Sequence, residues 1–177
     1  SALLFQPEFP ESVGKYCSQQ QDHGLENALD HKLVDYARNA LETHEPVKFS
    51  VPIRNRNRAV GATLSWEISK RYGENGLPQD TIQTCFKGSA GQSFGAFLVK
   101  GVEFTLEGDA NDYLGKGLSG GRLIVRPPDN TTFIPEDNII IGNVALYGGT
   151  SGEAYVMGIA GERFAVRNSG VEAVVEG

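Results

Sequence analysis

The residues with the clearest potential for chemistry are glycines that lie beside a lysine and a serine. Residues 115–120 read Gly-Lys-Gly-Leu-Ser-Gly, which matches the fingerprint of dinucleotide-binding loops. In such loops a strand leads in and a helix leads out, so that the pyrophosphate meets the helix N-terminus. Here the exit, residues 122–128, is an apolar run that ends in two prolines, which is typical of a strand. We therefore interpret these glycines as a turn.

Two other groups of side chains have the chemistry of metal ligands. The first is a set of three carboxylates, Glu107, Asp109 and Asp112, and the second is Cys17, His23 and His31. Carboxylates could bind a hard cation, but in turns they more often accept hydrogen bonds from their own backbone. The second set has irregular spacing, whereas structural zinc sites use four closely patterned ligands. We predict no metal site.

The chain offers no arrangement that is typical of nucleophilic catalysis. Ser89, Ser93 and Ser119 have glycine neighbours, but no Gly-x-Ser-x-Gly elbow occurs. Cys17 and Cys85 lack histidine nearby in the sequence. We predict no catalytic residue and no cofactor-binding residue in this chain.

Three arginines, Arg54, Arg56 and Arg58, alternate along a predicted extended segment. Side chains at every second position of such a segment point the same way, so they could bind an anion or nucleic acid, or pair with carboxylates at an interface. The formal net charge of the chain is −6, and no aromatic residue lies between the arginines. We therefore favour an interface or intramolecular pairing.

Helical elements are predicted before residue 80. Apolar residues recur at helical spacing from Leu25 to Leu41, with Asp30 among the residues of the polar face, Asp22 as N-cap and Pro46 as the stop. A second helix is predicted at about residues 61–72.

Short strands are predicted from residue 49 onward. Residues 49–53 form an edge strand because they contain a proline, and residues 81–86 alternate as a strand does. Later apolar runs are three to five residues long and rich in β-branched and aromatic residues, which favours β-structure. They lie at residues 97–99, 102–106, 123–125, 139–141, 144–147, 155–156, 164–166 and 171–175.

Glycines separate these runs at a nearly constant period. Seventeen of the 22 glycines lie at or after position 88, and pairs such as Gly101 and Gly120 are 19 positions apart. A small barrel or sandwich would need Asn-Gly or Asp-Gly hairpin turns, and neither dipeptide occurs. The period favours a right-handed parallel β-helix whose corners are glycines. The predicted corners are Gly88, Gly91, Gly95, Gly117, Gly120, Gly121, Gly142, Gly149, Gly152, Gly161 and Gly170.

Composition limits the remaining classes of protein. The 177 residues are 40% hydrophobic, enough for a core, and no apolar run is long enough to span a membrane. The part after residue 88 has 6 basic and 11 acidic residues, which disfavours nucleic-acid binding. Two cysteines and no signal peptide favour a cytoplasmic protein. We divide the chain into an extended arm (1–20), a helical approach (21–80) and the β-helix (81–177).

Several stretches closely resemble the C-terminal domain of the glutamate synthase large (alpha) subunit. They are residues 21–23, 57–61, 88–97, 107–121, 141–143, 146–148 and 160–170. The resemblance implies a right-handed parallel β-helix. It covers nearly the whole chain from residue 21, and its stretch 21–33 is more similar to the pyridine-nucleotide-dependent branch than to the ferredoxin-dependent one.

The resemblance also implies a role in glutamate biosynthesis and ammonia assimilation. The parent enzyme makes two glutamates from glutamine, 2-oxoglutarate and a reductant. One of its domains releases ammonia with a terminal cysteine, and a barrel domain carries FMN and a [3Fe-4S] cluster. The C-terminal domain binds no cofactor and packs between them. Its implied partners are the other domains of the large subunit and a small reductase subunit or domain.

The family's coil continues past the position of Gly177, so we expect this chain to be a piece of a larger enzyme, cytoplasmic or, in a photosynthetic eukaryote, in the plastid stroma. Two alternatives stay open. One is a β-helix subunit of another enzyme complex, such as formylmethanofuran dehydrogenase. The other is an independent anion-binding module that uses Arg54, Arg56 and Arg58.

Overall fold

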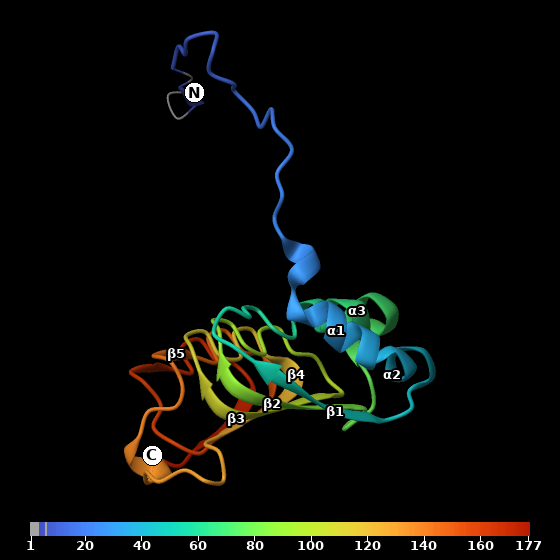
Figure 1. Cartoon of the computed structure of the whole chain (residues 1–177), viewed down its shortest axis with the longest axis vertical. Coiled ribbons are helices and arrows are strands. Elements are labelled where there is room, and N and C mark those ends of the chain that lie inside the picture. The colour runs from blue at the N-terminus through green and yellow to red at the C-terminus, as the bar shows by residue number, and fades with distance from the viewer. Residues whose placement is uncertain (1–3, 6) are drawn as a thin grey trace.

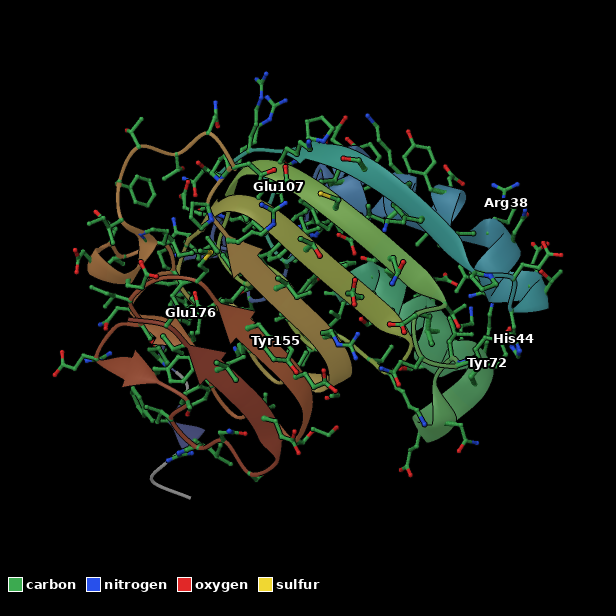
Figure 2. All side chains as sticks on the ribbon, turned by 90° about the horizontal axis from the view of Figure 1, so that it is seen from below. Arg38, His44, Tyr72, Glu107, Tyr155 and Glu176 are labelled. Atoms are coloured by element: carbon green, nitrogen blue, oxygen red, sulfur yellow. The ribbon has the colours of Figure 1, made fainter. Side chains whose placement is uncertain are left out.

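A computed structural model describes residues 4, 5 and 7–177 and places six strands in one parallel sheet, in the order β1-β2-β3-β4-β6-β8 (Figures 1 and 2). Their bounds are β1 (Val47–Ile53), β2 (Ile82–Ala90), β3 (Val102–Ala110), β4 (Ser119–Arg126), β6 (Ser151–Val156) and β8 (Val171–Val175). A second, parallel pair consists of β5 (Val144–Ala145) and β7 (Arg163–Phe164).

Helices flank the β1 end of the sheet (Figure 1). They are α1 (Leu29–Tyr36), α2 (Arg38–Thr43) and α3 (Ala62–Tyr72), with 3-10 turns η2 (Leu25–Asn27) and η3 (Gly73–Asn75). A further 3-10 turn, η4 (Pro135–Asp137), lies between β4 and β5, near the C-terminus (Figure 1). Helices α1 and α3 pack against each other, and their apolar side chains join the core of the sheet. Among the described residues, no helix has the length and apolar character needed to cross a membrane.

The sheet buries alternate residues because successive side chains of a strand point to opposite faces. In β3 the buried residues include Val102, Phe104 and Leu106, and their neighbours 103, 105 and 107 are half-buried on the other face. Phe104 meets the rings of Phe86 and Phe94 at centroid distances of 4.8 and 5.6 Å. Each fully buried side chain of this size contributes about 1.5–3 kcal/mol relative to an exposed one.

The predicted fold class, a right-handed parallel β-helix, is wrong. The structure is an α/β fold, with a parallel six-stranded sheet flanked by helices. The period of about 19 residues does separate some neighbouring strands: paired residues of β2 and β3, of β3 and β4, and of β6 and β8 are 19 or 20 positions apart. Paired residues of β1 and β2 and of β4 and β6 are more than 30 positions apart. The period therefore reflects the spacing of some parallel neighbours but not the course of the residues that connect them. In the described residues these connections are mostly turns and isolated bridges, and their regular strands are only the two-residue β5 and β7.

Several local predictions are also corrected. The first helix starts at Leu29 with Ala28 at its N-cap, and the Asp22 carboxylate instead accepts a hydrogen bond from the Gly24 N–H. The runs 97–99 and 139–141 lie outside the named strands, where Val99 and Ile139 make isolated bridges. The second helix and the edge strand, by contrast, are confirmed by α3 and β1.

Candidate interface on the open face of the sheet

One face of the six-stranded sheet, which we call the open face, carries the polar and half-buried residues of the strands. Figure 2 looks onto this face, where the strands lie side by side and Glu107 and Tyr155 stand on it. Parallel sheets are usually covered on both faces, because their crossover connections place structure on each side. Here the helices and the core lie on the opposite face. The open face is therefore the part of the sheet most suited to contact another protein surface.

A row of charged residues crosses the open face with Arg122 at its centre. The strand register aligns six residues across the sheet, Lys48, Gln83, Glu103, Arg122, Glu153 and Glu172. The Arg122 guanidinium donates to Glu153 Oε2 at 2.7 Å and to Glu103 Oε2 at 2.9 Å. It also reaches Asp80 Oδ1 at 3.2 Å, so one cation joins three carboxylates.

These contacts shift the pKa values of Glu153, of Arg122 and of the neighbouring Tyr155. The hydrogen bond from Arg122 lowers the pKa of Glu153, because it favours the ionised carboxylate. The same contacts, first with Glu153 and then with Glu103, raise the pKa of Arg122. Tyr155 donates its hydroxyl to Glu153 Oε2 at 3.1 Å, which raises the pKa of the phenol. The ion pair of Arg122 and Glu153 is thus charged at neutral pH.

A second charged row lies four residues further along the strands. Arg126 donates to Glu107 Oε1 at 2.6 Å and also contacts Asp129, and Lys87 Nζ lies 3.1 Å from Glu107 Oε2. Cross-strand pairs of opposite charge stabilise neighbouring strands by a few tenths of a kcal/mol to about 1 kcal/mol each. Glu107 therefore acts as a bridge between β2, β3 and β4.

Between the two charged rows runs a less polar stripe. The register aligns its members as Ser50, Cys85, Thr105, Ile124, Tyr155 and Val174. Tyr155 and Val174 are exposed, whereas Cys85, Thr105 and Ile124 are half-buried between their neighbours. An apolar stripe with a polar rim is the composition of a protein interface. The arrangement suits docking to another protein surface.

The predicted glycine corners fall into two sets in the structure. Gly88 lies inside β2, Gly120 and Gly121 inside β4, and Gly152 inside β6. The others, Gly91, Gly95, Gly117, Gly142, Gly149, Gly161 and Gly170, lie between strands. At Gly121, whose φ is ordinary, an added Cβ would lie 2.7 Å from the Leu98 side chain, so this glycine permits close packing of the layers.

The three predicted interface arginines lie in and directly after a turn that follows β1. Residues 54–57 form a turn, in which the Asn57 N–H donates to the Arg54 carbonyl at 2.8 Å, so the predicted extended segment is wrong. Arg54, Arg56 and Arg58 are all exposed, and none of them lies within salt-bridge distance of a carboxylate of residues 4, 5 and 7–177. They lie beyond the end of β1, outside the open face.

The side chains that the sequence analysis considered as metal ligands, and the glycines of residues 115–120, have the following surroundings in the structure. Within the described part of the chain no three His, Cys, Asp or Glu side chains form a group that could hold a metal ion. Asp109 accepts a hydrogen bond from Ser89 Oγ at 2.7 Å, and Asp112 Oδ1 accepts one from the Asn143 N–H at 2.9 Å. The glycines of residues 115–120 lead directly into β4 and not into a helix.

The sequence analysis missed the structural role of Asp30, which it placed on the polar face of a helix. Asp30 is only 3% exposed, and its carboxylate accepts hydrogen bonds from the backbone N–H groups of Gly61, Thr63 and Leu64. It thereby caps the start of α3 from α1. Burial raises its pKa, although the three N–H donors act in the opposite direction. Helical periodicity alone cannot reveal a cap that a residue provides to another helix.

Comparison with known proteins gives a consistent result. The family model described as the GXGXG motif matches residues 30–177. The chain is 60% identical over 176 residues to the NADH glutamate synthase of Schizosaccharomyces pombe, which covers 98% of this chain. It is 52% identical to the NADPH glutamate synthase large chain of Bacillus subtilis and 43% identical to the chloroplastic ferredoxin-dependent glutamate synthase of Spinacia oleracea, and each covers 100% of this chain.

These matches confirm the resemblance to the glutamate synthase large subunit that the sequence indicated. The chain spans 8% of the length of the yeast relative and 11% of the length of the other two. Nine-tenths of each relative therefore has no counterpart in this chain.

Proposed function

Because this chain belongs to the GXGXG motif family, we propose that it is a structural, non-catalytic segment of a glutamate synthase. In this role it packs between the domain that hydrolyses glutamine and the FMN domain that makes glutamate. The observation that carries the proposal is the open face, a parallel sheet face with an apolar stripe between two charged rows. The small share of each relative that the chain covers supports a partner in the same polypeptide.

The open face is the surface that we assign to this packing. Several of its charges are already paired within the sheet, since Arg122 and Arg126 each contact carboxylates of neighbouring strands. A partner would therefore cover charges that are paired beforehand, which reduces the cost of removing them from water. The apolar stripe would supply the gain in free energy on burial.

The proposal is tested by hydroxyl-radical footprinting of Tyr155 in the chain alone and in the full-length polypeptide. We expect oxidation of Tyr155 to fall by about tenfold in the longer protein, because the interface excludes water from its side chain. Tyr36 on α1 is the matched control, since it is exposed but lies on a helix away from the open face. Equal oxidation of Tyr155 in both samples would contradict docking through this face.

The non-catalytic role has a separate test. The chain alone should release no ammonia from glutamine and should leave the absorption spectrum of added FMN unchanged. Activity of the chain in either assay would contradict the proposal, whatever the footprinting shows.

Cofactors and partners of the parent enzyme follow from the same proposal. FMN and the three-iron cluster would be held by other domains, and a small reductase subunit or domain would supply electrons. In support, the two cysteines lie far apart in the fold, Cys17 in the arm and Cys85 in β2. The pyridine-nucleotide donor stays a prediction, because relatives named for NADH and for ferredoxin are 60% and 54% identical to the chain. Assaying the parent with each donor tests it.

A further inference from the structure

A pocket of about 760 Å³ lies between helix α3 and the turns that connect the strands. Trp66 on α3 and Phe97 on the facing turn line it, together with Ser65, Val99, Lys100 and Thr150. Trp66 is 55% exposed and Phe97 is 53% exposed, so two large aromatic side chains face solvent at one site. We call this site the Trp66–Phe97 pocket. It is separate from the open face.

Phe97 has a backbone conformation that is strained for an aromatic residue. Its φ is +59°, in the left-handed region that bulky residues rarely adopt. The equivalent positions of the next two turns are Gly117 and Gly148, with φ of +62° and +63°. The equivalence follows from backbone hydrogen bonds, since the Phe97 N–H donates to Lys116 and the Gly117 N–H donates to Tyr147.

Core packing does not explain the aromatic side chain at this position. Glycine would fit the same backbone without strain, as it does in the neighbouring turns. Half of the Phe97 side chain remains exposed, and its covered side rests on Gly117. Strain at an exposed aromatic residue points to recognition, because exposed aromatic anchors contribute most of the binding energy in many interfaces.

The chain itself contains a segment of matching chemistry. Residues 7–11 read Pro-Glu-Phe-Pro-Glu, and Phe9 is 47% exposed. The arm that carries them leaves the body near α1 and points away from it (Figure 1), so its own body does not cover Phe9. Two prolines at this spacing favour the extended polyproline conformation, which docks in grooves lined by aromatic residues.

Charge complements the apolar match. Glu8 and Glu11 flank Phe9 in the arm. Lys100 lines the pocket, and Lys70 Nζ lies 4.8 Å from the centre of the Trp66 ring. Glu74, also in the lining, is the one carboxylate there among the described residues. Lys100 in the lining and Lys70 beside Trp66 supply positive charge at the pocket, which suits a segment with negative charge.

We propose that residues 7–11 of one copy dock in the Trp66–Phe97 pocket of a second copy, with Phe9 between the two aromatic rings. Each copy carries both the arm and the pocket, so two copies can fill each other's pockets and form a closed dimer. Lys70 and Lys100 face Glu8 and Glu11.

The test uses the full chain, in which Trp66 is the only tryptophan. With rising concentration, sedimentation velocity should show a dimer, and Trp66 emission should shift to shorter wavelength with less quenching by acrylamide. Phe9→Ser and Phe97→Gly should each weaken the dimer by more than about tenfold, as loss of a central anchor does. Phe5→Ser is the matched control, because Phe5 lies exposed on the same arm and should leave the dimer intact.

A mixing experiment decides between exchange and other arrangements. The Phe9→Ser variant keeps an intact pocket, and the Phe97→Gly variant keeps an intact arm. A mixture of the two should therefore form a heterodimer, and the Trp66 emission should shift. Neither variant alone should dimerise or show the shift. Circular dichroism melts check that both variants fold. Three results would each overturn the proposal: no dimer in the wild-type chain, a dimer that survives both substitutions, or an emission shift that depends on Phe9 but not on concentration.

Discussion

The two faces of the same six strands are held together by different physics. On the covered face, Phe86 packs edge-on against Phe94 and Phe104, and all three rings are fully buried together with apolar residues of α1 and α3. On the open face, ion pairs around Arg122 and Glu107 connect neighbouring strands within reach of water. Apolar burial is strong and has no direction, whereas half-exposed ion pairs are weak but specific.

Stability and recognition are therefore assigned to different faces of the sheet. The covered face supplies most of the free energy of folding, since its side chains lose nearly all contact with water. The open face contributes little to folding and leaves a patterned surface for a partner. Substitutions on opposite faces of a single strand should therefore differ in their main effect, even when they are adjacent in sequence.

Removal of a core ring should have the largest effect. Phe104→Ala deletes a fully buried ring that contacts Phe86 and Phe94, and we expect the free energy of unfolding to fall by about 3–5 kcal/mol. Urea denaturation followed by circular dichroism measures it. Thr105→Ala, one residue away on the open face, is the control and should cost less than about 1 kcal/mol. Similar losses in both variants would contradict the division between the faces.

Asp30 should give the next largest effect, because it ties the helices to the covered face. Asp30→Ala leaves the N–H groups of Gly61, Thr63 and Leu64 without their acceptor, and we expect a loss of about 2–4 kcal/mol. Asp35→Ala on the same helix is the control, because its pair with Arg38 is exposed and should be worth less than about 0.5 kcal/mol. Equal melting of the two variants would show that the cap is unimportant.

The difference between the two faces also explains which features of the structure could be predicted from the sequence. Alternating apolar residues and glycine spacing predicted parallel neighbours such as β3 and β4, because these patterns reflect local geometry. They did not predict the fold class, since the path of the connections depends on packing between distant segments. Asp30 was misplaced for the same reason: its acceptor role depends on residues 31–34 positions away. The two charged rows of the open face could not be predicted either, because their alignment depends on the strand register.

The pH dependence of stability should have opposite sign on the two faces. Burial raises the pKa of Asp30, so its contribution to stability is present below the unfolded value of about 3.9 and is lost as pH rises through the higher folded value. The pKa of Glu153 is lowered, so its contribution is present above about 4.3 and is lost as pH falls through the lower folded value.

Two isosteric variants isolate these contributions. Measured by urea denaturation from pH 2 to pH 7, the stability of the wild-type chain relative to Asp30→Asn should rise toward acid. Its stability relative to Glu153→Gln should fall toward acid. Parallel curves for the two variants would contradict the assigned directions of the pKa shifts.

The ion-pair row itself should give the smallest effect on stability. A double-mutant cycle of Arg122→Met and Glu153→Gln should show a coupling of about 0.5–1 kcal/mol, because the pair is half-exposed and competes with water for its hydrogen bonds. The same cycle with Asp80→Asn, the longest of the three contacts, should show less. A coupling above about 2 kcal/mol would place the row among the main supports of the fold. In that case the open face could not be treated as a surface that is free to serve a partner.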